Sequence, residues 1–299
     1  MQQLVSVVIV NFNAGPGLVD CVASIVAACY PAQIVVVDND SQDDSIERLT
    51  AAFGTLEALH IVRNDANLGF SRACNIGARR SSAPYLLFLN PDCLIYPDTI
   101  SSLVQALEKH PDAGVAGGML LNPDGSEQAG GRRAVPTPWR VLVRISGLFH
   151  LKHRYPGIFS DYLLHQEPLA DHEMEVEATS GACMMMPRKA MEAAGCFDEE
   201  YFLHVEDLDC CTRMREKGFK VLFVPGAKVM HRKGVCGRDR PVFVEWHKHR
   251  GLVRFYGKYF RRQYPGLLMA LVFGGVWAHF LVVAALRLLR GKSPGDGEA

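Results

Sequence analysis

Residues 85–98 read YLLFLNPDCLIYPD, and they join an apolar strand to a turn that ends in a carboxylate. The run Tyr85–Leu89 is apolar throughout, which is typical of a strand covered on both faces of a sheet. It leads directly into Asn90-Pro91-Asp92. All three are ordinary turn residues, so one interpretation is a plain turn. The other is that the carboxyl end of the strand holds a metal ion for a phosphorylated ligand.

The residues before this stretch repeat a pattern of apolar strands separated by helical segments. Strands buried on both faces and alternating with helices predict an α/β fold with a mostly parallel, doubly wound sheet. Ligands bind such sheets at the carboxyl ends of the strands, where Asn11, Asp38 and Asp92 fall. The strand candidates are residues 4–13, 33–41 and 59–64, and the helical candidates are residues 17–28, 43–53 and 71–80.

The composition is that of a globular chain with no net charge. Of its 299 residues 48% are hydrophobic, and 32 Lys and Arg balance 32 Asp and Glu; we expect no nucleic-acid partner. The nine cysteines include no C-x-x-C spacing, which predicts free thiols in a reducing compartment. The first residues, MQQLVSVVIVNFN, contain no basic leader or cleavage site and are interpreted as the first strand.

The last quarter of the chain combines a basic stretch with a long apolar run. Between Lys228 and Arg262 there are eleven Lys or Arg and two acids, which suggests an anionic surface. Residues 266–286 include one strongly polar side chain, His279. At about 1.5 Å per residue a helix there spans about 30 Å, one hydrocarbon thickness. A buried core helix, a single span, an in-plane anchor and a hairpin bent at Gly274-Gly275 are all compatible. The basic residues before the run favour a cytoplasmic location for the preceding domain.

The region between residues 130 and 170 mixes Gly, Pro, basic and aromatic residues without a clean period. We interpret it as a partly helical insertion, or lid, over the site. Regular structure is expected to return at residues 173–177, where glutamates alternate with apolar residues as in a half-exposed strand.

Six motifs, spread in order over residues 4–235, carry a family resemblance. They are similar to those of family-2 inverting glycosyltransferases of the GT-A fold, most of all to the bacterial rhamnosyltransferase branch, in which Asn-Pro-Asp replaces Asp-x-Asp. The resemblance implies a catalytic domain over residues 1–235, followed by a basic collar and a membrane-associating segment over residues 236–299. The motifs read VSVVIVNFNAG, IVVVDNDSQDDS, NLGFSRACNIGAR, LFLNPD, SGACMMMPR and FDEEYFLHVEDLDCCTRMREKG.

The resemblance implies a divalent cation, Mg²⁺ or Mn²⁺, at the Asn-Pro-Asp turn. A hard cation held by carboxylate oxygens offsets the charge that develops on a departing nucleoside diphosphate. Asp92 is the implied ligand, with Asn90 as a neutral neighbour of the ribose or donor sugar. Replacing Asp-x-Asp removes one charge, which lowers the expected metal affinity. His231 matches the position of a histidine near the diphosphate and metal, although a purely structural role is equally compatible.

The nucleotide is implied to lie over the first three strand ends. Asp38 resembles the residue that accepts a hydrogen bond from N3–H of uracil or thymine, which implies a UDP or dTDP donor. Asp40 is assigned either to this pocket or, with Asp43, to capping of the next helix. Asn67, Gly69 and Arg72 resemble the segment that closes over the nucleotide, with Arg72 either pairing with phosphate or exposed to solvent. The predicted nucleotide and donor residues are Asn11, Asn13, Asp38, Asp40, Asn67, Gly69, Arg72, Asn90, Gly181 and Ala182.

The second half of the chain is expected to supply the base. Inversion by a single displacement needs a carboxylate that takes the proton of the attacking hydroxyl. By the family pattern Asp207 is that base, and Glu206 orients it or stands in for it. Acids at the start of a helix also stabilise the helix dipole, so a structural role is the alternative. Gly181 and Ala182 are expected to permit close approach of a substrate.

These features predict a membrane-associated inverting glycosyltransferase at the cytoplasmic side of the inner membrane. The resemblance suggests L-rhamnose from dTDP-L-rhamnose, moved to a glycan or lipid-linked acceptor of cell-envelope polysaccharide. Alternatives are a UDP-sugar donor carrying GlcNAc, Gal, Glc or galactofuranose, and a non-catalytic nucleotide-binding module tethered to the membrane. A sugar-phosphate nucleotidyltransferase is disfavoured because NFNAGPG, after the first strand, contains no Lys or Arg. The acceptor, linkage and oligomeric state are left open.

Overall fold

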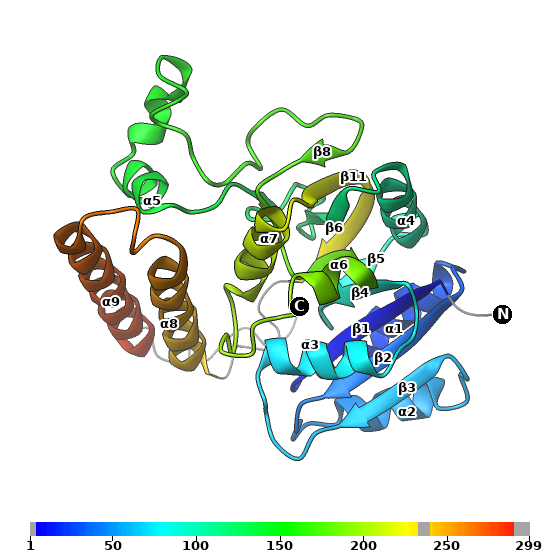
Figure 1. The fold of residues 1–299 in the computed structure, drawn as a ribbon. Helices are drawn as coiled ribbons and strands as arrows, with labels where there is room; N and C mark the ends of the chain where they lie inside the picture. Colours follow the sequence, from blue (N-terminus) through cyan, green and yellow to red (C-terminus); the bar gives the residue numbers. More distant parts are fainter. Residues whose placement is uncertain (1–3, 233–239, 290–299) are drawn as a thin grey trace.

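A computed structural model describes residues 4–232 and 240–289 of the chain. One half of its central sheet is parallel and follows the predicted strand–helix alternation (Figure 1). All seven residues of β1 are buried, because helices cover both faces of the sheet at this point. The strands of this half, in spatial order, are β3 (Leu59–Arg63), β2 (Ala32–Asp38), β1 (Val5–Asn11) and β4 (Tyr85–Leu89).

The other half of the sheet is mixed. An antiparallel strand, β10, lies between β4 and β6 and joins the two halves. β11 runs parallel to β6 and is flanked by the short antiparallel strands β5 and β8. The predicted α/β fold with a mostly parallel sheet is therefore confirmed. The bounds are β5 (Cys93–Ile95), β6 (Ala113–Leu121), β8 (Met174–Glu175), β10 (Cys183–Pro187) and β11 (Lys220–His231).

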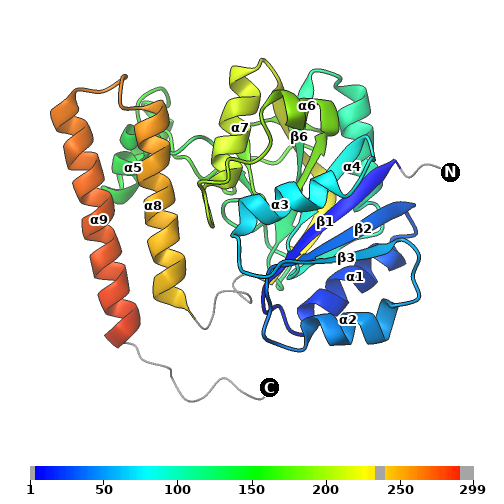
Figure 2. The ribbon, with the colours of Figure 1, turned by 60° about the horizontal axis from the view of Figure 1, so that its bottom comes forward.

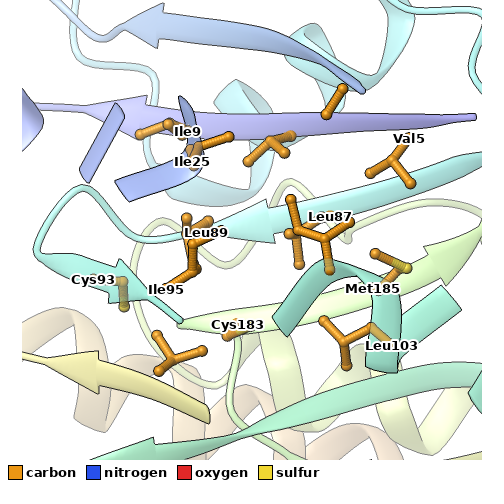
Figure 3. Packing of buried hydrophobic residues seen from close by; sticks show 14 of the residues in the cluster. Val5, Ile9, Ile25, Leu87, Leu89, Cys93, Ile95, Leu103, Cys183 and Met185 are labelled. Atoms are coloured by element: carbon orange, nitrogen blue, oxygen red, sulfur yellow. The ribbon is translucent and has the colours of Figure 1, made fainter. Parts of the chain in front are cut away.

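Helices cover the sheet in two layers, and alternate residues of each strand serve the two cores. In β1, Val5, Val7 and Ile9 belong to the core beneath α1, α2 and α4, whereas Val8 and Val10 belong to the core beneath α3, α6 and α7. Figure 3 shows the first core, in which side chains from several strands meet those of the covering helices. The helices are α1 (Gly17–Ala27), α2 (Ser45–Phe53), α3 (Phe70–Arg79), α4 (Thr99–Lys109), α6 (Arg188–Ala193) and α7 (Glu206–Glu216).

Two long helices form a hairpin beside the sheet domain (Figure 2). They are α8 (Pro241–Tyr259) and α9 (Gly266–Leu289). The apolar α9 has a mean hydropathy of 2.2 over its most apolar window, of which 17% is buried, so it is not a core helix. It is long enough to cross a membrane by length and composition. The helix continues through Gly274-Gly275, which excludes the bent hairpin.

The inserted region extends away from the sheet domain and lies near the α8–α9 hairpin (Figures 1 and 2). It contains α5 (Pro138–Ile145) and η1 (Leu148–His153), in agreement with a partly helical insertion. Its base is fixed by Arg132, which is 1% exposed, binds both carboxylate oxygens of Glu127 and donates to the carbonyl of Glu167. This ion pair makes the attachment rigid while most of the insertion stays on the surface.

Some predicted boundaries differ from the structure. The strand expected over residues 173–177 is shorter in the structure, where β8 covers only Met174–Glu175. The next strand, β9 (Ala178–Thr179), pairs with β7 (Arg132–Arg133) in a separate small sheet. Glu177 lies between these two strands and pairs with Arg140 of the insertion. The helix expected from residue 43 begins at Ser45. The eight described cysteines form no disulfide with one another. The domain boundary predicted at residue 235 lies outside the described residues.

Candidate active site

One large cavity opens at the carboxyl ends of the strands, where the sequence predicts the site. Its volume is about 2230 Å³, whereas ligand pockets are typically about 300–1000 Å³, so it has room for two substrates together. It is lined by residues from both halves of the chain. The predicted site residues that line the cavity are Asn13, Asp40, Asn67, Gly69, Asn90, Asp92, Gly181, Ala182, Glu206, Asp207 and His231.

Asp92 and His231 form the group best suited to a metal ion. His231 ends β11, opposite Cys93 of β5, and this pairing places His231 Nε2 3.3 Å from Asp92 Oδ1. With Cys93 the ligand atoms lie within 4.8 Å of one another, and all three residues are buried. Burial and the Asp92 charge raise the pKa of the Cys93 thiol well above its usual value. The Cys93 thiol instead donates to the Ala182 carbonyl over 3.4 Å. Carboxylate oxygen and imidazole nitrogen suit Mg²⁺ or Mn²⁺ better than a soft sulfur does, so Asp92 and His231 are the pair that fits a divalent cation.

Gln128 holds the histidine ring in place, and the sequence contains no signal for it. His231 Nδ1 donates to Gln128 Oε1 over 2.7 Å, while Gln128 Nε2 donates to the carbonyl of His231 over 3.2 Å. Because Nδ1 carries a hydrogen in this bond, Nε2, the nitrogen beside Asp92, is the ring atom that could bind a metal ion. The two residues are 103 positions apart, and only the folded chain brings them together.

We expect Gln128→Leu to weaken Mn²⁺ binding about 10- to 100-fold, the usual effect of removing a group that orients a ligating histidine. The leucine leaves Nδ1–H without its acceptor and frees the ring to turn. Mn²⁺ binding followed by electron paramagnetic resonance measures the change. Gln105→Leu, on the exposed face of α4, is the matched control. Equal Mn²⁺ affinity in both variants would show that Gln128 does not position the ring.

The two predicted acids lie at the start of α7, behind a strained segment of backbone. His204 and Val205 have φ values of +66° and +73°, a region that residues other than glycine rarely occupy and that concentrates at functional sites. Both Glu206 and Asp207 are nearly buried and line the cavity. The strained turn therefore places two adjacent acidic residues on the wall of the cavity.

Asp207 is held in its ionised form. Arg133 Nη2 donates to its Oδ2 over 2.5 Å, and the Gly181 N–H donates to the same oxygen over 3.0 Å. Burial raises the pKa of Asp207, but the Arg133 charge and these hydrogen bonds outweigh burial, so the pKa lies below its usual value. A Cβ on Gly181 would lie 3.3 Å from Asp207 Cβ. Gly181 therefore lets Asp207 approach its backbone closely, and close approach of a substrate at Gly181 stays a prediction.

Arg133 is a second residue that the sequence does not reveal. It belongs to β7, at the base of the insertion, and also donates to the carbonyl of Thr179 over 3.0 Å. Its Nε is buried and has no hydrogen-bond partner among the described residues. The insertion therefore supplies a cation that contacts the predicted base.

Glu206 has the opposite environment from its neighbour. Burial, reinforced by the Asp207 charge, raises the pKa of Glu206 to about 8. Its Oε2 is buried without a hydrogen-bond partner in the described part of the chain. At neutral pH Glu206 is thus a neutral acid beside an ionised aspartate, an arrangement that separates a donor from an acceptor of protons.

We expect Glu206→Gln to remove a pH-dependent loss of stability. The unfolded chain ionises Glu206 near its usual pKa of 4.5, but the folded protein ionises it only near 8, so the free energy of unfolding falls as pH rises between these values. Since one pKa unit corresponds to about 1.4 kcal/mol, the variant should gain a few kcal/mol over the parent at pH 8. Chemical denaturation at pH 4.5 and 8 tests this, with Glu216→Gln, at the exposed end of α7, as control. An equal difference at both pH values would contradict it.

The predicted nucleobase residues divide into supporting and lining groups. Asn11 Nδ2 donates to Asp38 Oδ1 over 2.9 Å and to Ser45 Oγ over 2.8 Å, so it joins the ends of β1 and β2 to the start of α2. Asn13 and Asp40, both with positive φ, line the cavity. Asn11 and Asp38 lie behind them and fix the shape of this end.

Asn39 organises the segment predicted to close over the nucleotide. It donates to Asn67 Oδ1 over 2.9 Å and to the Gly69 carbonyl, and its own oxygen accepts from the Leu68 N–H. A Cβ on Gly69 would lie 2.8 Å from the carbonyl oxygen of Phe202, which explains the glycine. In the sequence Asn39 lies between Asp38 and Asp40. Nothing in that motif indicates that Asn39 holds the closing segment in place.

Arg72 lies outside the cavity lining in the described structure. Its side chain is 55% exposed, and its Nε is 3.6 Å from Glu199 Oε2. The same segment contains Asn75, whose amide exchanges two hydrogen bonds with the backbone of Phe197. This arrangement agrees with the solvent-exposed alternative for Arg72, and phosphate contact by Arg72 stays a prediction.

Known proteins match both the sequence and the fold. The family model described as Glycosyl transferase family 2 matches residues 6–169. The chain is 29% identical over 252 residues, 80% of each protein, to the N-acetylglucosaminyl-diphospho-decaprenol L-rhamnosyltransferase of Mycobacterium tuberculosis. It is 26% identical to the dTDP-rhamnosyl transferase RfbF of Shigella flexneri over 72% of this chain and 65% of that protein.

Among solved structures, the fold is similar to that of the mannosyltransferase PcManGT from Pyrobaculum calidifontis in complex with GDP-Man and Mn²⁺. The TM-score is 0.59 at 16% identity, covering 99% of this chain and 77% of that one. The family match covers more than half of the chain and includes the strands that build the donor side of the cavity. The chain therefore belongs to glycosyltransferase family 2 and has the GT-A fold.

Proposed function

We propose that this chain is an inverting, metal-dependent rhamnosyltransferase that uses dTDP-L-rhamnose and a lipid-linked glycan acceptor in cell-envelope polysaccharide synthesis. The observation that carries the proposal is that a buried Asp92–His231 pair and the Glu206–Asp207 acids line one cavity with room for two substrates. The names of the relatives from Mycobacterium tuberculosis and Shigella flexneri support rhamnose as the sugar.

Asp92 and His231 would hold the divalent cation, Mn²⁺ or Mg²⁺. A bound cation supplies positive charge to the diphosphate that departs from the sugar. Asp92 contributes a hard oxygen ligand and His231 an imidazole nitrogen, which together suit Mn²⁺ at least as well as Mg²⁺. Asn90 lies on the cavity wall beside them and is proposed to contact the ribose or the donor sugar.

Asp207 is proposed to accept the proton of the acceptor hydroxyl. As the hydroxyl oxygen bonds to the anomeric carbon from one face, the bond to the diphosphate oxygen breaks on the other, and the configuration inverts. Arg133 and the Gly181 N–H keep Asp207 ionised and oriented before the acceptor arrives. Glu206, protonated at neutral pH, can donate a hydrogen bond to an acceptor oxygen without competing for the proton.

The donor and the domain roles follow from the same arrangement. Asn13 and Asp40 are proposed to form the pyrimidine end of the cavity, with Asn11 and Asp38 supporting them from behind. Asn67 and Gly69 are proposed to form its closing edge. Residues 1–235 then form the catalytic domain, with residues 130–170 as a lid. Residues 236–299 hold the domain at the cytoplasmic face of the membrane, which the exposed apolar surface of α9 supports.

A thermal-shift panel on detergent-purified protein tests the proposal. It compares dTDP, UDP, GDP and CMP, each with Mn²⁺, with Mg²⁺ and with EDTA. A ligand at 100 times its dissociation constant should stabilise the fold by about 2.7 kcal/mol. Stabilisation by dTDP above UDP that requires metal, followed by transfer from dTDP-L-rhamnose, is the expected result. Stabilisation by UDP alone would rule out dTDP-L-rhamnose as the donor. No stabilisation by any of the four nucleotides would favour a non-catalytic module.

A further inference from the structure

The cavity continues beyond the proposed donor and base residues into a groove between α5, α8 and α9. Its walls there are apolar: Trp139 and Leu142 of α5 face the same cavity as Leu271, Val276 and Val283 of α9. Leu142 and Leu271 are 52% and 66% exposed, so the groove is open to its surroundings. A nucleotide sugar has no apolar part that would occupy such a groove.

A polar cluster lies on the α8–α9 hairpin and lines the same cavity. Arg287 Nη2 donates to Glu245 Oε1 over 2.7 Å, and His249 Nε2 lies 2.9 Å from His279 Nδ1. Glu245 and His249 are buried, at 6% and 2% exposed. Burying polar groups in an apolar hairpin is costly, and apolar side chains would pack the two helices equally well.

The cluster has an excess of positive charge. Lys248 Nζ lies 3.7 Å from Glu245 Oε2, and Arg240 and Arg287 line the same cavity. Two of these cations, Lys248 and Arg287, contact the single carboxylate of Glu245, and Arg240 adds a third positive charge to the same cavity wall. Lys248 and Arg287 are 47% and 44% exposed, and a guanidinium has five N–H donors, so both retain donors for a ligand. A ligand with a doubly charged anionic group would balance the cluster.

The cluster is also close to the proposed base. A Cβ on Gly251 of α8 would lie 3.1 Å from the carbonyl oxygen of His204 and 3.2 Å from Val205 Cγ2, so α8 packs against the turn that places Glu206. Lys248 and Glu245 precede Gly251 by about one and two helical turns, which corresponds to about 5–9 Å along the axis.

We propose that this part of the cavity binds the carrier of the acceptor, with the diphosphate at Lys248 and Arg287 and the isoprenoid chain in the groove between α5 and α9. The inference rests on the proposed function and assigns the acceptor side of the same cavity. A sugar attached to the diphosphate then extends along α8 toward Asp207, and the chain leaves the groove beside the exposed apolar face of α9, where a membrane would supply it. Glu245 is a positioning residue that orders the two cations.

Tryptophan fluorescence provides a direct test, because one tryptophan lines the groove and the other two lie on the helices that flank it. Trp139 lines it, and the rings of Trp246 and Trp277, on α8 and α9, are 4.9 Å apart. Farnesyl diphosphate is titrated into the detergent-purified full chain at fixed detergent concentration. Farnesol, which lacks the anion, and inorganic pyrophosphate, which lacks the chain, serve as paired probes. We expect saturable binding of farnesyl diphosphate at least tenfold tighter than that of either probe.

Variants then locate the anion. Lys248→Gln, and the double variant with Arg287→Gln, should weaken farnesyl diphosphate at least tenfold while leaving the metal-dependent shift with dTDP unchanged. Arg250→Gln removes an exposed cation of the same helix that is outside the cavity lining and should behave as the parent chain. The inference would be overturned if farnesol bound as tightly as farnesyl diphosphate. It would also be overturned if the Arg250 variant lost as much affinity for farnesyl diphosphate as the Lys248 variant. Intact lipid binding without any nucleotide response would overturn the proposed function and leave this site standing.

Discussion

Asp207→Asn is expected to lower the rate of sugar transfer by about 10²–10⁴-fold, the usual contribution of a positioned general base. Asparagine keeps the shape of the side chain and an oxygen that can accept from Arg133 and the Gly181 N–H, but it cannot take the proton of the attacking hydroxyl. Nucleotide binding should persist, because Asp92 and the strand ends are untouched. Single-turnover transfer from dTDP-L-rhamnose measures the rate, and the thermal shift with dTDP and Mn²⁺ measures binding.

Two further variants make this result specific. Glu216→Gln removes an acid from the exposed end of the same helix and should leave the rate unchanged. Glu206→Gln should lower the rate less than Asp207→Asn, because Glu206 is already uncharged at neutral pH and glutamine can still donate a hydrogen bond. A normal rate of transfer in the Asp207 variant, together with a large loss of rate in the Glu206 variant, would mean that Glu206 and not Asp207 is the base.

The fold was predictable because its signals are local. A strand such as β1, buried at every position, must be apolar throughout, and the turns at the strand ends carry their polar residues next to it in the sequence. Asn90 and Asp92 could therefore be placed at the end of a strand from a short stretch alone, whereas their proposed roles depend on the resemblance carried by all six motifs. The position of β10 between β4 and β6 could not be predicted from the sequence, because the apolar residues of β10 suit an antiparallel strand as well as a parallel one.

The site was less predictable than the fold because its support comes from distant residues. Arg133 reaches Asp207 across 74 positions, and Gln128 reaches His231 across 103. Neither residue has a distinctive sequence neighbourhood, and Arg133 lies in the insertion, which carries no recognisable motif. The one polar residue of the apolar run, His279, was visible in the sequence. Its partner His249 was not, since the pairing depends on how α8 and α9 pack.

Asp92→Asn is expected to abolish the metal-dependent stabilisation by dTDP and to reduce transfer by about 10³-fold. A cation at a departing diphosphate contributes several kcal/mol to the transition state, and about 1.4 kcal/mol corresponds to each factor of ten in rate. Asn90 already replaces one acid of the usual pair, so Asp92 is the carboxylate ligand of the candidate metal group. In the Asp92→Asn variant His231 would be the main ligand left for the cation. Electron paramagnetic resonance with Mn²⁺ should show the lost affinity directly.

Asp98→Asn supplies the matched control, because Asp98 is an exposed acid six positions further along the same segment. It should retain Mn²⁺ affinity, the shift with dTDP and the rate of transfer. Wild-type Mn²⁺ affinity in the Asp92 variant, or transfer that EDTA does not slow, would mean that Asn90-Pro91-Asp92 acts only as a turn. The departing diphosphate would then have to be neutralised by side chains alone. Arg133, whose buried Nε lacks a partner among the described residues, would be the first cation to test in that case.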